Sequence, residues 1–240
     1  MVLLLAATSI QAQDQLAEVF PVAVSANASE VLQVRKGQLE GSAAPLYRCV
    51  FERTELPFSF TQLPLARALF NFQHGEAAVV VPLAQSEERD RFGAFAGPLI
   101  QVEYLVLSPR EITSFKSLQG MIYVLPRGHL GKQFVEDFVP GGFEVNSWEQ
   151  VFDILRLGRA DFTIVPRVLL ADLVEGSLDD YYTILAGTAP SSLYVANAYL
   201  GTGVYQQLRQ SVAACRQRFA QEIQQRQGGD QAPSADAGPR

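Results

Sequence analysis

Apolar and polar positions recur in the same order at two places in the chain. In Ala68–Pro82, and again in Asp153–Pro166, a helical pattern of apolar residues ends at a glycine, and a short apolar run then ends at a proline. An apolar run without alternation is typical of a strand that is covered on both faces, as in parallel sheets. The repeated helix–glycine–strand unit predicts two similar lobes.

The remaining periodicities extend this alternation of helix and strand. Helices are predicted over 43–53, 64–75, 131–139, 147–158, 166–176 and 203–225. Strands are predicted over 31–37, 57–63, 77–81, 101–108, 120–126, 161–165 and 181–187, with 31–37 as the first strand of the fold. The helix at 147–158 has a readable start, because Ser147 and Gln150 match a capping box.

Regular alternation of strand and helix predicts an α/β fold in which each lobe is a largely parallel sheet flanked by helices. We expect lobe 1 over 28–105, lobe 2 over 106–187, and a return to lobe 1 over 188–226 that ends in a long amphipathic helix. Open α/β sheets bind ligands at the carboxyl ends of their strands. The gap between the lobes is therefore the expected binding site.

The composition and charge of the chain limit the kinds of partner that we expect it to bind. The 240 residues carry a net charge of −6, and no basic stripe is present to contact phosphates, so we expect no nucleic-acid partner. No apolar run approaches the length of about 20 residues that spans a bilayer. We expect a monomer that binds a small molecule.

Both ends of the sequence differ from the globular part. Residues 1–13 contain a short apolar run followed by small and polar residues, as in a secretory signal peptide, so we expect export to the periplasm. Residues 227–240 lack apolar periodicity and are expected to be a disordered tail. Export makes Cys49 and Cys215 candidates for a disulfide, although two isolated buried thiols fit the sequence equally.

Motifs for catalysis are few. His74 and His129 lack the spacing of metal ligands, and no P-loop, nucleophile elbow or dinucleotide-binding glycine motif is present. We therefore expect no catalytic residue, metal or cofactor, and we interpret the chain as a binding protein.

Four stretches together resemble one family. They are SEER at 86–89 with Phe95–Pro98 six residues after the arginine, LPLARAL at 63–69, SLQGMIYVLPRGHLG at 117–131, and LRLGRADFTIV at 155–165. In this order they resemble the periplasmic solute-binding proteins of family 3, the amino-acid-binding type with the two-lobe type II fold. The resemblance runs from about residue 31 to residue 225 and implies delivery of a ligand to an ABC-type transporter in the inner membrane.

The resemblance implies an anion anchor in lobe 1. Arg89 matches the arginine that binds the α-carboxylate of the ligand, and Ser86 stands where the family offers a hydroxyl to the same carboxylate. A guanidinium can hold a carboxylate with two parallel hydrogen bonds. The alternative is that Arg89 pairs with Glu87 or Asp90 on a solvated loop.

Lobe 2 is expected to contribute a glycine-rich loop. Gly128 and Gly131 allow the backbone to turn N–H groups towards an anion at the start of the next helix. His129 and Leu130 lie between these glycines, in the place where the family commonly has Thr or Ser.

Departures from the family pattern change the expected ligand. Pro166 stands where amino-acid binders have the aspartate that holds the ligand ammonium, and the loop expected after the first strand, 37–43, lacks the usual aromatic. The resemblance therefore implies a carboxylate-bearing or other small polar ligand in place of an ordinary amino acid.

Two further functions fit the same fold. The chain could be a ligand-sensing or degenerate binding domain that acts through a separate sensor protein. It could also be a dehydratase or lyase, for which Glu103, Glu136 and His129 are the nearest acid–base candidates.

Overall fold

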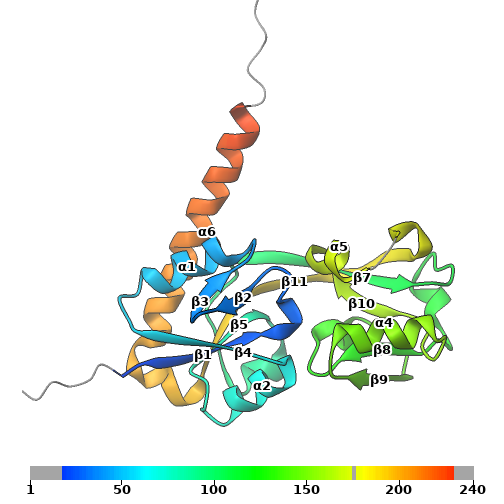
Figure 1. Cartoon of the computed structure of the whole chain (residues 1–240), viewed down its shortest axis with the longest axis horizontal. Coiled ribbons are helices and arrows are strands. Elements are labelled where there is room, and N and C mark those ends of the chain that lie inside the picture. Colours follow the sequence, from blue (N-terminus) through cyan, green and yellow to red (C-terminus); the bar gives the residue numbers. More distant parts are fainter. Residues whose placement is uncertain (1–17, 175–176, 230–240) are drawn as a thin grey trace, which may run out of the picture.

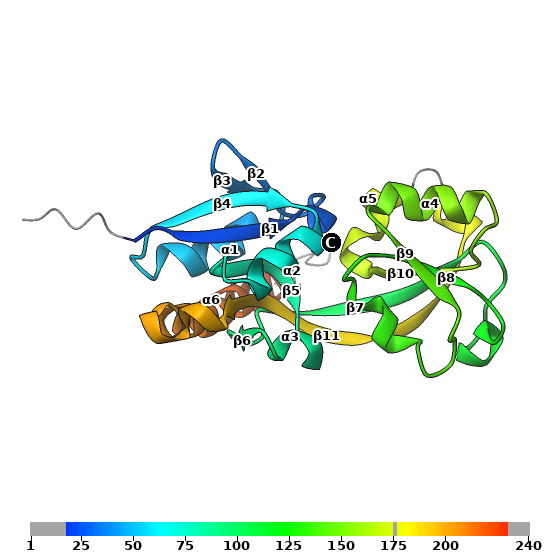
Figure 2. The same ribbon diagram turned by 90° about the horizontal axis from the view of Figure 1, so that it is seen from below.

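Two lobes are connected by a pair of long strands. The computed structural model describes residues 18–174 and 177–229. Strands β7 (Ile100–Ser108) and β11 (Tyr182–Ala196) run antiparallel beside each other from one lobe into the other (Figures 1 and 2). Both connections between the lobes are therefore strands of the same sheet.

A seven-stranded sheet extends through both lobes. Its strand order is β10-β7-β11-β5-β1-β4, with β6 beside β11. In lobe 1, β1 is parallel to both β4 and β5, and β11 joins β5 antiparallel. In lobe 2, β8 and β9 are parallel to each other, and a Tyr123–Phe162 bridge links them to β10. The further strands are β1 Phe20–Ser25, β2 Gln33–Arg35, β3 Gln38–Glu40, β4 Phe58–Leu63, β5 Val79–Ala84, β6 Gly93–Phe95, β8 Tyr123–Pro126, β9 Gly142–Val145 and β10 Thr163–Pro166.

Helices cover the sheet in both lobes. They are α1 Ala44–Glu52, α2 Leu65–Gln73, α3 Glu87–Asp90, α4 Trp148–Arg156, α5 Leu170–Leu173 and α6 Val204–Gly229. None of these described helices combines the length and the apolar character that a membrane crossing requires.

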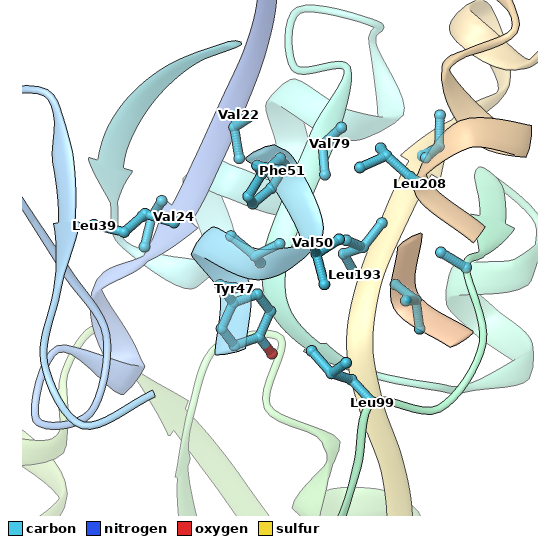
Figure 3. Packing of buried hydrophobic residues seen from close by; sticks show 14 of the residues in the cluster. Val22, Val24, Leu39, Tyr47, Val50, Phe51, Val79, Leu99, Leu193 and Leu208 are labelled. Carbon is cyan, nitrogen blue, oxygen red and sulfur yellow. The ribbon is translucent and has the colours of Figure 1, made fainter. Parts of the chain in front are cut away.

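The core of lobe 1 lies on both faces of its sheet. Alternate residues of β1 and β5 point towards α1 and α6 on one face and towards α2 on the other. Figure 3 shows the first face, where Phe51 of α1 lies beside Val79 of β5, and Tyr47, at the other end of the helix, lies towards Leu99. Burial on both faces explains why β5 reads as a continuous apolar run.

A disulfide joins the two helices of that face. Cys49 in α1 and Cys215 in α6 are bonded, with their Cα atoms 6.1 Å apart. The sequence left this pairing open, and the packing of α6 back onto lobe 1 brings the two residues together.

The repeated corner has the same backbone in both lobes. Gly75 follows α2 with φ +73°, and Gly158 follows α4 with φ +64°. This left-handed conformation suits glycine and ends each helix before the buried strand. At the other end of α4, the Ser147 hydroxyl accepts a hydrogen bond from the Gln150 N–H, but the Gln150 side chain accepts from the Asn146 N–H, one residue before the cap.

Three expectations about elements were wrong. The first strand is β1, not 31–37, where only the short β2 forms; β1 was missed because it follows closely on the presumed signal segment. The helix expected over 131–139 is a 3-10 helix over Leu130–Phe134. Helix α6 continues to Gly229, past the expected start of the tail.

The remaining expectations about the two ends of the chain concern residues that the structure does not describe. The signal-peptide segment 1–13 and residues 230–240 of the expected tail lie outside the described residues.

Candidate functional site

A short capped turn after β5 positions Arg89. The Ser86 hydroxyl accepts a hydrogen bond from the Arg89 N–H at 3.3 Å and thus caps α3. The hydroxyl of Tyr194 on β11 accepts from the Ser86 N–H at 3.1 Å and donates to a carboxylate oxygen of Asp90 at 2.6 Å. These bonds at both ends of the four-residue helix hold its backbone, and with it Arg89, in a fixed orientation.

Arg89 is 7% exposed as a residue, and its guanidinium contacts both lobes. It donates hydrogen bonds to the carbonyl oxygen of Ala84 in lobe 1 and, at 2.9 Å, to that of Gly128 in lobe 2. Neither Glu87 nor Asp90 pairs with it, unlike in the solvated-loop alternative. Burial lowers the pKa of the guanidinium, because the charged form loses its hydration.

His129 packs beside Arg89 as a neutral ring. Its Nδ1 accepts a hydrogen bond from the Gly131 N–H at 3.1 Å, so the proton of the neutral ring is on Nε2. The ring lies edge-on between Tyr104 and Trp148, with centroids 5.9 and 5.0 Å away. Burial, and next to it the positive charge of Arg89, lower the pKa of His129 to about 3. Burial also raises the pKa of Tyr104 to about 12.

A second hydrogen bond connects the lobes. The indole N–H of Trp148, at the start of α4, donates to the carbonyl oxygen of Asn27 at 3.0 Å. Asn27 follows β1, and its side-chain Oδ1 accepts from the N–H of Leu65 at 3.1 Å, which holds the start of α2. The Nδ2 atom of Asn27 is buried and has no hydrogen-bond partner.

Arg89, His129, Tyr104 and Asn27 help to line a mostly apolar cavity of about 100 Å³ between the lobes. Its polar lining consists of Ser25, Asn27, Tyr47, Arg89, Tyr104, His129 and Ser191. Its apolar lining consists of Ala28, Val31, Ala43, Leu65, Pro82, Leu83, Ala84, Ile100, Val102, Leu130, Pro166, Val168 and Leu169. None of the lining residues in the described part of the chain is an aspartate or glutamate.

A larger cavity of about 720 Å³ lies on the other side of the Arg89–Gly128 contact. Residues of both charges line it, among them Glu87, Glu88, Arg91, Lys132, Glu136 and Glu144. Arg89, His129 and Leu130 line both cavities and therefore separate them.

The structure brings most of the expected site residues together. Arg89, His129 and Leu130 line both cavities, whereas Ser86 and Gly128 line only the larger one. Gly131 lines neither cavity.

Two backbone N–H groups of the glycine-rich loop are hydrogen-bonded within the loop region. The N–H of His129 donates to the carbonyl oxygen of Pro126, and that of Gly131 donates to His129 Nδ1. These two donors are therefore satisfied within lobe 2. The Ser86 hydroxyl likewise serves as a helix cap.

The candidates for acid–base catalysis do not converge. Glu103 forms an ion pair with Arg167, and Glu136 is exposed and lines the larger cavity. Within residues 18–174 and 177–229, no three His, Cys, Asp or Glu residues are grouped as metal ligands.

Sequence reasoning missed several residues of the smaller cavity. Asn27, just after β1, and Tyr104 of β7 line this cavity. Trp148 of α4 does not line it but contacts both Asn27 and His129. Asn27 could have been found through its place at the end of β1, had that strand been recognised. No local signal marks Tyr104 or Trp148, since each reads as an ordinary core aromatic.

Sequence comparison and structure comparison give different results. Neither a protein-family model nor a curated protein matches the sequence. Solved structures do match. An ancestral arginine-binding protein bound to glutamine superposes with a TM-score of 0.69 at 16% identity, over 83% of this chain and 92% of that one.

Two further matches cover different biological roles. The arginine-, lysine-, histidine-binding protein ArtJ from Geobacillus stearothermophilus has a TM-score of 0.69 at 12% identity, over 82% of this chain and 89% of its own. A histidine kinase sensor domain with similarity to periplasmic binding proteins has a TM-score of 0.70 at 15% identity, over 85% and 93%. The resemblance seen in the sequence is thus confirmed for the architecture: the chain has the two-lobe α/β fold of periplasmic binding proteins.

Proposed function

We propose that this protein binds a small anionic solute between its lobes, with Arg89 as the anchor, and presents it to a membrane partner outside the cytoplasm. The observation that carries the proposal is the environment of Arg89. Its guanidinium is buried at the lobe interface, and in the described part of the chain no carboxylate pairs with it. A buried charge without a counter-charge is costly, and a ligand carboxylate would supply one.

The contact between Arg89 and Gly128 also suggests how binding couples to closure. One side chain of lobe 1 reaches a carbonyl of lobe 2 next to the cavity, and Trp148 reaches back to Asn27. A ligand held by Arg89 would favour the arrangement in which the lobes meet, because the guanidinium contacts both lobes there.

The test compares two arginines of the same turn. Arg89→Met removes the proposed anchor, whereas Arg91→Met removes an exposed positive charge two residues away. Thermal unfolding is measured with acetate, pyruvate, butyrate, succinate and the common amino acids. A ligand at one hundred times its dissociation constant stabilises by about 2.7 kcal/mol.

We expect stabilisation by at least one carboxylate in the wild type and in Arg91→Met, and none in Arg89→Met. Carboxylate binding that survives in Arg89→Met would contradict the proposal. A folded wild type that responds to none of these solutes would also contradict it.

Two kinds of membrane protein are candidates for the partner. One similar solved structure is the substrate-binding protein of an amino acid ABC transporter, which favours a permease of such a transporter. A sensor protein is the second candidate, favoured by the similarity to a histidine kinase sensor domain and by α6, which extends far beyond lobe 1 (Figure 1). Co-purification with α6 intact and with α6 shortened after Phe219 would separate a partner that needs this helix from one that does not.

A further inference from the structure

The chemistry of the smaller cavity narrows the class of ligand, an inference that rests on the proposed function. Arg89 offers a positive charge and, beyond its bonds to Ala84 and Gly128, further N–H donors. An α-amino acid would need a second, negative group for its ammonium. None of the described lining residues is acidic, and Pro166 occupies the end of β10 on the cavity wall.

The polar lining of the wall combines the N–H donors of Asn27, Arg89 and His129 with the hydroxyls of Ser25, Tyr47, Tyr104 and Ser191, which can donate or accept. Asn27 has its Oδ1 engaged by the Leu65 N–H, while its Nδ2 is buried and has no hydrogen-bond partner. His129 has its Nδ1 engaged by Gly131, which leaves only the Nε2 proton. An ammonium placed here would lose its hydration and find no negative charge among the described lining residues, whereas a carbonyl oxygen would accept from an N–H group of the wall.

The volume sets the size of the ligand. A dry cavity of about 150 Å³ accommodates a benzene ring. The cavity of about 100 Å³ therefore suits a body of roughly three or four carbon atoms. Leu65, Ile100, Val102 and Leu169 line it, so the part of the ligand beyond its oxygens meets apolar side chains.

From these three observations we infer that the cavity takes a short-chain 2-oxo carboxylate, with the carboxylate on Arg89 and the 2-oxo oxygen on Asn27 Nδ2. The ligand contributes only acceptors, which the N–H groups and hydroxyls of the wall can satisfy, and its small alkyl end fills the apolar part. Arginine and glutamine, the ligands of similar solved structures, are larger than this cavity and carry an ammonium.

The test uses ligands that differ at one atom. Isothermal titration of the wild type is performed with 2-oxobutyrate, 2-aminobutyrate and butyrate, and with 2-oxooctanoate as the size control. We expect 2-oxobutyrate to bind at least about tenfold more tightly than 2-aminobutyrate, as the loss of one buried hydrogen bond to an N–H and the burial of an unpaired ammonium require. Binding of 2-oxooctanoate should be lost.

A variant then reverses the preference. Asn27→Asp keeps the oxygen that accepts from the Leu65 N–H and replaces the Nδ2 donor by a carboxylate oxygen. We expect the affinity for 2-oxobutyrate to fall by about tenfold, because the Nδ2 donor is lost. We expect the affinity for 2-aminobutyrate to rise, because the ammonium now has a counter-charge. The thermal midpoint without ligand shows whether the variant is folded.

The outcomes separate the two proposals. If 2-aminobutyrate binds as tightly as 2-oxobutyrate to the wild type, the inference about the ligand class fails while the anchor at Arg89 stands. If 2-oxobutyrate and butyrate both fail to bind, this inference fails, and the proposed function then depends on the wider set of solutes. If 2-oxobutyrate binds equally well to Arg89→Met, the proposed function fails as well.

Discussion

The two lobes share a scaffold but differ in the chemistry that they bring to the cleft. Each has a helix, a left-handed glycine and a buried strand, at α2–Gly75–β5 and α4–Gly158–β10. After β5 the chain forms a capped turn that presents Arg89. After β10 it continues through Pro166 into an apolar turn on the cavity wall. The comparison shows that a repeated backbone leaves the chemistry of the site to the loops that follow it.

The lobes also differ in how they are held together. In lobe 1 the Cys49–Cys215 disulfide closes a loop of 166 residues that includes all of lobe 2. Within the described residues no free cysteine remains, so lobe 2 relies on packing, with α4 against one face of its sheet. The following predictions test this contrast, beginning with the largest expected effect.

Loss of the disulfide should weaken lobe 1 most. The double variant Cys49→Ala, Cys215→Ala removes a cross-link of long range, and we expect a loss of about 2–5 kcal/mol in the free energy of unfolding. Chemical denaturation measures the loss, and hydrogen exchange assigns it to a lobe. Protection should fall in α1 and α6 before it falls in α4. An equal loss of protection in both lobes would show that they unfold as one unit.

The two glycines of the repeated corner, Gly75 and Gly158, should differ in how well they tolerate substitution by alanine. Gly75→Ala and Gly158→Ala both place a side chain at positive φ, which costs about 1–2 kcal/mol. At Gly75 the new Cβ would also lie 3.2 Å from the Cβ of Ala198, whereas nothing lies within 4 Å at Gly158. We therefore expect the larger loss of unfolding free energy for Gly75→Ala.

A third glycine serves as the control for this pair. Gly201 has no positive φ and no atom within 4 Å of an added Cβ, so Gly201→Ala should leave the stability nearly unchanged. A larger loss for Gly158→Ala than for Gly75→Ala would contradict the steric explanation.

Acid should destabilise lobe 2 through His129. Its pKa is about 3 in the folded protein, below the ordinary value of 6.5, so the unfolded chain binds more protons between these values. Stability attributable to His129 is therefore present at neutral pH and is lost as the pH falls below about 6.5. Between pH 7 and pH 5.5 we expect the wild type to lose about 1 kcal/mol more than His129→Gln.

Denaturation curves at several pH values measure this difference. His74→Gln, which removes the other histidine from the exposed end of α2, is the matched variant. Parallel pH profiles for the wild type and His129→Gln would show that the ring is not held neutral by its surroundings.

Much of the fold could be predicted because its signals are local. A continuous apolar run predicts the covered strand β5. Helical apolar periodicity and the Ser147 cap predict α4 and its first residue. The 3-10 helix at Leu130–Phe134 could not be distinguished from an α-helix, because its apolar spacing fits both. Strand β1 was hidden by a neighbouring segment with a similar apolar character.

The candidate site was predictable only in part. Arg89 stood out because it follows a buried strand in a motif-like turn, and Pro166 stood out as a replacement for a charged residue. The partners of Arg89 did not stand out, since a guanidinium that binds the backbone oxygens of Ala84 and Gly128 leaves no pattern in the side chains.

The sequence by itself determined the alternation of strand and helix, the two repeated corners, the arginine after β5 and the missing acid after β10. These features depend on each residue and its near neighbours, which periodicity and spacing report directly. Only the tertiary structure decided that Cys49 meets Cys215, that Trp148 reaches Asn27, and that the loop N–H groups of His129 and Gly131 are already bonded. Those contacts join residues far apart in the chain or depend on backbone orientation, and packing selects them from many pairings that the same pattern of residues allows.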